Sequence, residues 1–182
     1  MNFLILGAGG IGSYFGARLI ESGNEVSFVA RGKQLQALQQ KKLKLQHPEF
    51  CFEQKVISYN IEEITKLDFS NFDAVLLTTK STSTLALSKL LQICFDNEEK
   101  IPYIVSLQNG VENEEILSDD LNNEYIIAGL TRKIGAHIVS PAVISATGTA
   151  ETILGAIKDT AENQIFLKNL QDAFNQAKAR EN

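Results

Sequence analysis

The chain has 182 residues, of which 44% are hydrophobic and 21% charged, and this balance excludes a disordered or fibrous protein. Its 17 Lys and Arg residues against 22 Asp and Glu residues leave a net charge of −5, which argues against non-specific nucleic-acid binding because such binding needs a basic face. The length is enough for one domain with a substantial core and short for two.

The cysteines and the N-terminus indicate the compartment. Cys51 and Cys94 follow no zinc-binding or Cys-x-x-Cys spacing and are too few for a disulfide framework, so we expect apolar filler residues in a reducing cytoplasm. The apolar run at residues 3–6 is far shorter than the ~20 residues of a membrane span and follows no basic segment. We therefore expect a cytoplasmic protein that does not bind membranes.

The first thirty residues predict a βαβ unit. Residues 1–6 form a buried strand, because consecutive large apolar side chains cannot leave one face in water. Residues 7–12 form a glycine-rich turn, and residues 26–30 form a second strand. The helix between them has apolar residues at three- and four-residue spacing on one inward face, namely Ile11, Phe15, Leu19 and Ile20.

The alternation of strands and helices then continues. Further buried strands are predicted at residues 73–78, 103–107 and 124–130. Further helices are predicted at residues 32–40, 82–95 and 112–121. Residues 43–57 predict short strands around the turn at His47 and Pro48.

The pattern changes after Gly135. Short β-type runs at residues 138–139, 143–144 and 152–154, separated by turn residues, predict an antiparallel edge or flap on the parallel sheet. A last helix is predicted at residues 160–180, with an inward face of Ile165, Phe166, Leu170, Phe174 and Ala177. The predicted fold class is α/β, a Rossmann-type, doubly wound, mostly parallel sheet with short antiparallel edge strands near the C-terminal third.

A G-x-G-x-x-G motif lies between the first predicted strand and the first predicted helix, and this context makes a weak pattern specific. In that context the first glycine allows a tight turn, the second lets backbone approach a pyrophosphate, and the third brings helix and strand together. The candidate cofactor-binding residues here are Gly7, Ala8, Gly9, Gly10, Ile11 and Gly12. The alternatives are a turn that serves backbone geometry only and an S-adenosylmethionine site, which usually does not need the third glycine.

The end of the second strand indicates which dinucleotide is preferred. NAD-binding proteins usually place Asp or Glu there for the ribose 2′-hydroxyl, about 20 residues beyond the glycines. This chain has Arg31 at that position, with Lys33 close by, while Glu25 lies at the other end of the strand. A guanidinium binds a 2′-phosphate through charge-assisted hydrogen bonds, so we predict NADP(H) and not NAD(H). The alternative is that Arg31 is a solvated surface charge.

Two polar residues follow predicted strands directly. Lys80 comes after the strand at residues 73–78, and Asn109 comes after the strand at residues 103–107. Open α/β sheets bind ligands at the carboxyl ends of their strands, so Lys80 is a candidate to contact a phosphate or substrate carboxylate and Asn109 to orient a nicotinamide or a substrate. Each is equally compatible with a surface lysine or a turn asparagine when taken alone.

The remaining polar groups favour no further site. His137 lies in a predicted β-segment without a nearby carboxylate to orient it, which argues against a general-acid role. His47, beside Pro48, is predicted to be a loop residue. The acidic runs at residues 112–115 and 118–120 are typical of helix ends, so no metal site is predicted.

Taken together, these segments resemble the ketopantoate reductase (2-dehydropantoate 2-reductase) family. The resemblance rests on residues 1–12, 29–32, 78–80 and 107–115 in that order and spacing, and residues 129–155 look like the end of that family's cofactor domain. It implies that Arg31 recognises the NADP 2′-phosphate, that Lys80 and Asn109 contact cofactor and substrate, and that Gly135 contacts NADP through its backbone. Glu112 departs from the glycine that the family often has there.

The resemblance also implies a reaction and a domain division. The family transfers a hydride from NADPH to the ketone of 2-dehydropantoate, a small 2-oxo acid, giving pantoate for pantothenate and coenzyme A biosynthesis. It implies an NADP-binding domain at residues 1–170, with residues 171–182 ending the last helix and starting a linker to a helical substrate domain. The family's general acid is a lysine in a Trp-x-Lys segment of that second domain, and this sequence has no Trp. We therefore assign no catalytic residue in this chain and expect it to turn over little substrate by itself. We expect the full-length enzyme to be a homodimer.

Two other functions compete with this interpretation. A free-standing NADP-sensing module would need neither Lys80 nor Asn109. A reductase of another 2-oxo acid would share every feature above, because substrate choice in such enzymes is set largely by the second domain.

Overall fold

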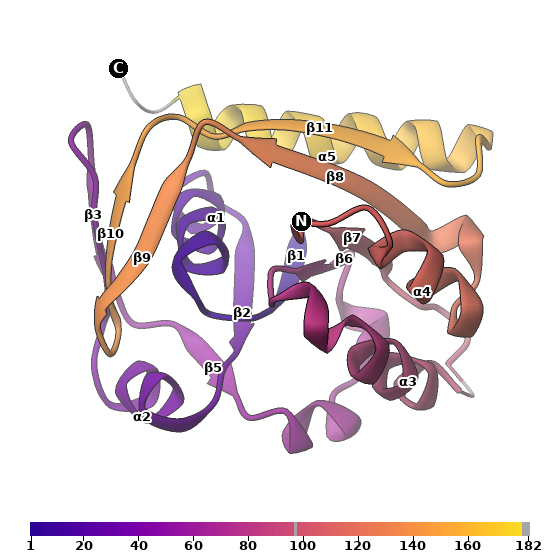
Figure 1. Cartoon of the computed structure of the whole chain (residues 1–182), viewed down its shortest axis with the longest axis horizontal. Coiled ribbons are helices and arrows are strands. Elements are labelled where there is room, and N and C mark those ends of the chain that lie inside the picture. Colours follow the sequence, from indigo (N-terminus) through magenta and orange to yellow (C-terminus); the bar gives the residue numbers. More distant parts are fainter. Residues whose placement is uncertain (97, 180–182) are drawn as a thin grey trace.

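A seven-stranded sheet forms the centre of the computed structural model, which describes residues 1–96 and 98–179 (Figure 1). The strand order is β11-β8-β7-β6-β1-β2-β5, and all neighbours are parallel except β11, which runs antiparallel to β8. The strands are β1 (Asn2–Leu6), β2 (Glu25–Val29), β5 (Ile57–Tyr59), β6 (Ala74–Leu77), β7 (Tyr103–Ser106), β8 (Ile126–Arg132) and β11 (Glu151–Ala156). The doubly wound, mostly parallel sheet with an antiparallel edge strand is confirmed.

Helices cover both faces of this sheet, as a parallel sheet requires. The helices are α1 (Gly10–Glu21), α2 (Gly32–Gln40), α3 (Thr84–Phe95), α4 (Asn113–Asp120) and α5 (Ala161–Ala179). The core on one face includes residues of α1 and α5, and the core on the other includes residues of α3 and α4. Short 3-10 helices, which the sequence did not predict, cover Glu62–Lys66, Phe69–Asn71, Ser81–Ser83 and Asn123–Tyr125. No helix in the described residues is both long and apolar enough to cross a membrane.

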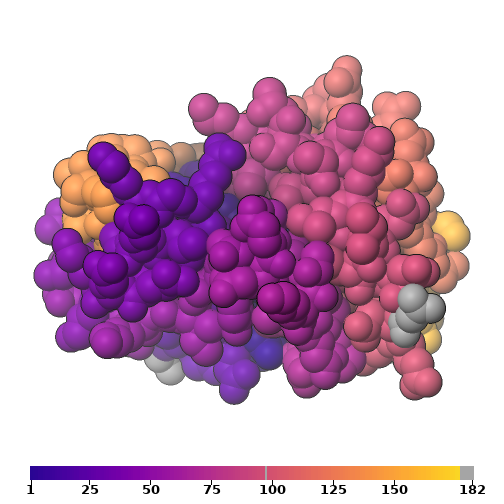
Figure 2. Space-filling model, turned by 90° about the horizontal axis from the view of Figure 1, so that it is seen from below, coloured from indigo at the N-terminus to yellow at the C-terminus, as the bar shows by residue number. Residues whose placement is uncertain are grey.

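A second, four-stranded sheet has the order β4-β3-β10-β9 and lies beside α1 (Figure 1). Its strands are β3 (Leu43–Gln46), β4 (Cys51–Gln54), β9 (Gly135–Ser140) and β10 (Val143–Thr147). The C-terminal strands thus divide between the two predicted arrangements: β11 is the antiparallel edge of the main sheet, whereas β9 and β10 form a flap outside that sheet and pair through β10 with β3. That pairing joins two segments far apart in sequence, which no local pattern reveals. Figure 2 shows the orange segment of this sheet beside indigo and purple atoms of the N-terminal third.

The second sheet explains why α1 is buried on more than one face. Beyond its predicted apolar stripe, Ser13, Tyr14 and Arg18 are also buried. The Arg18 guanidinium lies 4.1 Å from the centre of the Phe50 ring and 3.0 Å from a Glu21 carboxylate oxygen. The helix thus fills the space between two sheets, and its charged residue is accommodated by a cation–π contact and an ion pair.

The last helix is rotated relative to the sequence prediction. Phe166, Leu170 and Phe174 are buried as predicted, but Ile165 is 64% exposed and Leu167 faces the core instead. The Phe174 ring lies 5.3 Å from the Phe15 ring of α1, and the Phe166 ring stacks on Tyr103 of β7 at 3.7 Å. The side chain of Ala177 lies outside the described residues. Of the two cysteines, Cys94 is buried as predicted, whereas Cys51 on β4 is exposed.

Candidate functional site

The strand order of the main sheet reverses between β1 and β6. From β1 the chain builds outward to β2 and β5 on one side, and from β6 to β7 and β8 on the other. The loops that leave β1 and β6 therefore diverge to opposite faces of the sheet, and open α/β sheets bind ligands at the carboxyl ends of the strands at such a point. The glycine-rich turn follows β1, and Lys80 and Asn109 follow β6 and β7, so the topology brings the predicted site residues to one edge.

Two glycines of the turn are required by the protein itself. Gly7 has φ +114°, a left-handed conformation that favours glycine, and a Cβ there would lie 2.9 Å from Thr79 Cγ2. A Cβ on Gly12 would lie 2.0 Å from the carbonyl oxygen of Gly7 and 2.4 Å from Thr78 Oγ1. These glycines produce the tight turn and the close contact of α1 with β1 that the motif predicts.

Gly9 is different, because nothing in the described protein requires a glycine there. Its φ is −80°, and no atom lies within 4 Å of the position that a Cβ would occupy. It precedes α1, a helix of 12 residues that has no side-chain hydrogen bond at its N-cap. The first backbone N–H groups of a helix have no intrahelical partner and attract anions. The open space beside Gly9 thus fits a phosphate group of a dinucleotide.

Strand β9 packs directly against the start of α1. A Cβ on Gly10 would lie 2.1 Å from the carbonyl oxygen of Ala136 and 2.7 Å from the backbone nitrogen of His137. Gly10 is therefore needed for the second sheet to reach the glycine-rich turn. This contact also brings Gly135, the residue before Ala136, to the same part of the molecule as the turn, with an exposed backbone.

Thr78 and Gln34, which the sequence analysis did not single out, hold the glycine-rich turn. The Thr78 hydroxyl donates to the carbonyl oxygen of Gly7 at 2.8 Å. The Gln34 amide donates to the carbonyl oxygen of Ala8 at 2.9 Å and accepts a hydrogen bond from the backbone N–H of Ala142 at 2.9 Å. Gln34, a residue of α2, thus joins the glycine-rich turn to the second sheet. Its partner Ala142 lies 108 residues away in the sequence.

Arg31 is the N-cap residue of α2 and lies beyond the carboxyl end of β2. Its side chain is exposed and makes no hydrogen bond or ion pair within the described residues. The turn is tied to the same strand end, because the N–H groups of Gly7 and Ala8 donate to the carbonyl oxygen of Val29 at 3.1 and 3.2 Å. The exposed Arg31 guanidinium therefore lies just beyond the end of the strand to which the glycine-rich turn is bonded, whereas Glu25 begins that strand at its far end.

Lys80 and Asn109 lie at corresponding places on neighbouring strands. Leu77 and Ser106, which end β6 and β7, are paired in register, and each candidate residue follows its strand end by three positions. Both side chains are exposed. The fold thus brings Lys80 and Asn109 to the same end of the sheet, as the sequence predicted.

His47 lies in the loop between β3 and β4, as predicted, but it has more partners than a loop residue needs. It is 8% exposed, and its Nε2 lies 2.9 Å from the carbonyl oxygen of Gly148, while Nδ1 accepts from the backbone N–H of Glu49 at 3.2 Å. Both ring nitrogens are engaged and the ring stacks on Phe50, so His47 is structural. His137 is exposed on β9.

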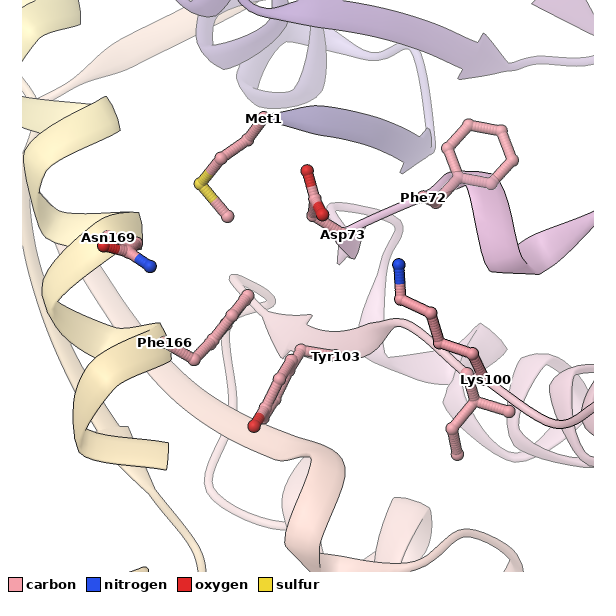
Figure 3. A pocket seen from close by; sticks show the side chains of 8 residues that line it. Met1, Phe72, Asp73, Lys100, Tyr103, Phe166 and Asn169 are labelled. Carbon is pink, nitrogen blue, oxygen red and sulfur yellow. The ribbon is translucent and has the colours of Figure 1, made fainter. Parts of the chain in front are cut away.

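A pocket of about 180 Å³ opens at the opposite edge of the sheet, where the strands begin (Figure 3). Met1, Asp73 and Tyr103 line it, and Figure 3 shows Phe166 and Asn169 entering from α5. Two of its polar groups have partners within the protein: the Asp73 carboxylate accepts the N–H of Asn2 at 2.8 Å, and the Tyr103 hydroxyl donates to Asn163 at 2.9 Å. Burial raises the pKa of the Tyr103 phenol. These contacts point to a structural role.

Comparison with known proteins agrees with this geometry. Residues 3–159 match the family model of ketopantoate reductase PanE/ApbA. The 2-dehydropantoate 2-reductase of Pyrococcus abyssi is 33% identical over 178 residues, which cover 97% of this chain and 54% of the relative. The uncharacterized oxidoreductase YkpB of Bacillus subtilis is 31% identical over 71% of this chain and 40% of the relative. The chain thus spans about half the length of the relatives it matches.

Solved structures share the fold. The 2-dehydropantoate 2-reductase of Geobacter metallireducens superposes with a TM-score of 0.81 at 29% identity, covering 97% of this chain and 56% of that one. D-mandelate dehydrogenase in a ternary structure with NADH and anilino(oxo)acetate also gives 0.81, at 26% identity, covering 97% and 55%. The matched residues, the sheet order and the glycine-rich turn lead to one conclusion: this chain belongs to the ketopantoate reductase PanE/ApbA family, a family of NAD(P)-dependent oxidoreductases.

Proposed function

We propose that this chain is the NADPH-binding domain of an oxidoreductase that reduces 2-dehydropantoate to pantoate. The observation that carries the proposal is the pairing of an unobstructed Gly9 at the start of α1 with an exposed Arg31 at the end of the adjacent strand. The first suits a pyrophosphate and the second a ribose 2′-phosphate. Membership of the family and the names of the curated relatives support the reaction.

Each candidate residue has a role in this proposal. The glycine-rich turn and the first N–H groups of α1 bind the pyrophosphate, Arg31 binds the 2′-phosphate, and Gly135 offers its backbone. Lys80 and Asn109 orient the nicotinamide and the 2-oxo acid at the strand ends. The bound NADPH would supply the hydride that reduces the substrate ketone.

The preference for NADP(H) over NAD(H) is part of the proposal. D-mandelate dehydrogenase, a structural neighbour, is described with NADH, so the shared fold is compatible with either dinucleotide. In this chain the deciding position carries a guanidinium, whereas a carboxylate would repel a 2′-phosphate.

A titration with each dinucleotide tests this preference. We expect the wild type to bind NADPH at least ~10-fold more tightly than NADH, a difference of about 1.4 kcal/mol. Arg31→Ala should remove that difference by weakening NADPH binding alone, because NADH has no 2′-phosphate for the guanidinium to bind. Gln36→Ala, an exposed residue of the same helix, is the control. Equal affinities for the two dinucleotides, unchanged in Arg31→Ala, would reject the preference, and binding of S-adenosylmethionine alone would reject the dinucleotide site.

The 182 residues are proposed to bind cofactor without efficient turnover. General acid catalysis contributes roughly 10²–10⁴-fold, and the Trp-x-Lys segment that supplies the family's acid requires a Trp that this sequence lacks. We expect stoichiometric NADPH binding together with a 2-dehydropantoate reduction rate at least ~100-fold below that of a relative of full length. Comparable rates would overturn this part of the proposal.

A second candidate is reduction of a different 2-oxo acid. The similarity to D-mandelate dehydrogenase favours it, because that neighbour is described with anilino(oxo)acetate at 26% identity. Competition between 2-dehydropantoate and anilino(oxo)acetate in the full-length enzyme separates the two candidates. We also propose that the protein acts in the cytoplasm and that residues 1–170 form the NADPH-binding domain. We propose that the full-length enzyme is a homodimer, and light scattering tests this oligomeric state.

A further inference from the structure

Beneath the exposed Lys80 and Asn109 lies a set of buried polar side chains. Thr84 is 0%, Gln108 6% and Asn113 1% exposed, and they come from α3, from the loop after β7 and from the first turn of α4. Burying polar groups costs free energy unless each is hydrogen-bonded, and apolar side chains would fill the same space without that cost. The hydrogen bonds of these residues therefore indicate what they do.

Gln108 binds the loop that follows β6. Its side-chain nitrogen lies 3.1 Å from Thr79 Oγ1, 3.2 Å from the carbonyl oxygen of Thr79 and 3.3 Å from the carbonyl oxygen of Lys80. An amide nitrogen carries two hydrogens, so two of these acceptors are bonded at once. The residue that directly precedes Asn109 thus holds the loop segment formed by Thr79 and Lys80.

Asn113 binds the loop that follows β7. Its side-chain nitrogen donates to the carbonyl oxygen of Asn109 at 3.2 Å. Gly110, at φ +118°, lets the loop turn back over this amide, since a Cβ there would lie 3.2 Å from the Asn113 nitrogen and 3.8 Å from Ser81 Cβ. The two loops therefore meet at this point.

Thr84 connects the two amides. Its hydroxyl lies 2.8 Å from the side-chain oxygen of Asn113 and 3.3 Å from that of Gln108. A hydroxyl has one hydrogen, which goes to the nearer oxygen on Asn113 and fixes which side of that amide faces Asn109. The three side chains thus form one connected set between the backbones of Lys80 and Asn109.

We infer that Thr84, Gln108 and Asn113 are positioning residues that hold Lys80 and Asn109 at a fixed separation for the bound dinucleotide. The inference rests on the proposed function for the identity of the ligand, but the positioning itself is a property of the free protein. Ordering two loops before a ligand arrives lowers the entropy cost of binding, so affinity depends on the network although its side chains are buried.

The variant Thr84→Val tests the network. It keeps the shape of the side chain but removes the donor to Asn113, whereas Thr84→Ser keeps the hydroxyl. Thr152→Val is the matched control, because the Thr152 hydroxyl is also buried but has no partner among the described residues. The readouts are the NMR order parameters of the backbone amides of Lys80 and Asn109 without ligand, and the Kd for NADPH, both below the unfolding transition.

We expect Thr84→Val to lower the two order parameters from about 0.85 towards 0.6 or less and to raise the Kd roughly tenfold. Thr84→Ser should restore both values, and Thr152→Val should leave both unchanged. If Thr84→Val does not fold, Gln108→Leu is used in its place, because it removes the hydrogen bonds to Thr79 and Lys80. The expected changes in the order parameters and in the Kd are the same. Unchanged order parameters would overturn the network, whatever the variant does to the melting temperature.

The two readouts separate this inference from the proposed function. A wild-type chain that binds no NADPH would refute the proposed function, while the order parameters would still decide whether the network holds the loops. Lowered order parameters with an unchanged Kd would overturn the link between positioning and binding.

Discussion

At the scale of single residues, the glycines of one motif have separable roles. Gly7 and Gly12 are required by their own backbone and neighbours, whereas Gly9 faces open space. A motif that looks uniform in the sequence therefore combines glycines that the fold requires with one that the fold does not require and that we propose serves the cofactor. This separation can be measured by replacing glycine with alanine at two positions and comparing stability with cofactor binding.

Gly9→Ala should leave stability nearly unchanged and weaken cofactor binding. A methyl group there meets no protein atom, so we expect a loss of less than ~1 kcal/mol in the free energy of unfolding, together with a Kd for NADPH at least ~10-fold higher. Gly12→Ala is the contrasting variant, since its Cβ overlaps the Gly7 carbonyl and costs about 1–3 kcal/mol of stability. Denaturant unfolding and NADPH titration measure both effects, and tight binding by Gly9→Ala would show that the phosphates bind elsewhere.

At the scale of elements, α5 and β7 are joined by the stacked rings of Phe166 and Tyr103. Burial, together with the nearby Glu162 carboxylate, the Tyr125 ring and the Glu124 carboxylate, raises the pKa of the Tyr103 phenol above its ordinary value of 10.0. The neutral phenol donates to Asn163, which is on α5. The protonated Tyr103 hydroxyl therefore adds a hydrogen bond to the apolar contacts that hold this helix on the sheet.

The raised pKa of Tyr103 predicts a loss of stability in strong alkali. Because the pKa is raised in the folded state, the unfolded chain releases its phenol proton first, so the contribution of Tyr103 is complete below about pH 10 and disappears as the pH rises further. Tyr103→Phe should be less stable at neutral pH, where it lacks the hydrogen bond to Asn163, and should lose stability less steeply above pH 10. Denaturant unfolding across this range measures both, and equal slopes for the two proteins would contradict the prediction.

At the scale of the whole molecule, α1 is the centre on which the other layers pack. The main sheet lies on one side of it, the second sheet on another, and α5 contacts it through Phe174 (Figure 1). Residues 173 and 174 belong to this core although the proposed domain boundary lies at residue 170. The end of the last described helix thus contributes to folding.

Phe174→Ala should destabilise the chain by about 3–5 kcal/mol, because it leaves a cavity against Phe15. Ile165→Ala on the exposed side of the same helix should change stability by no more than ~0.5 kcal/mol. Thermal or denaturant unfolding of both variants tests the prediction. A loss below ~1 kcal/mol for Phe174→Ala would mean that the helix end folds independently of the domain.

The sequence by itself determined most strands of the main sheet and the placement of the candidate site residues at their ends. Buried strands, glycine turns and helix faces are encoded within a few neighbouring residues, so the βαβ unit and the positions of Arg31, Lys80 and Asn109 at strand ends were predictable. Only the tertiary structure decided which distant segments pair. The bond from Gln34 to Ala142 spans 108 residues and that from His47 to Gly148 spans 101, and the network of Thr84, Gln108 and Asn113 forms only when three separate elements meet. Such contacts depend on packing in three dimensions, for which local periodicity carries no information.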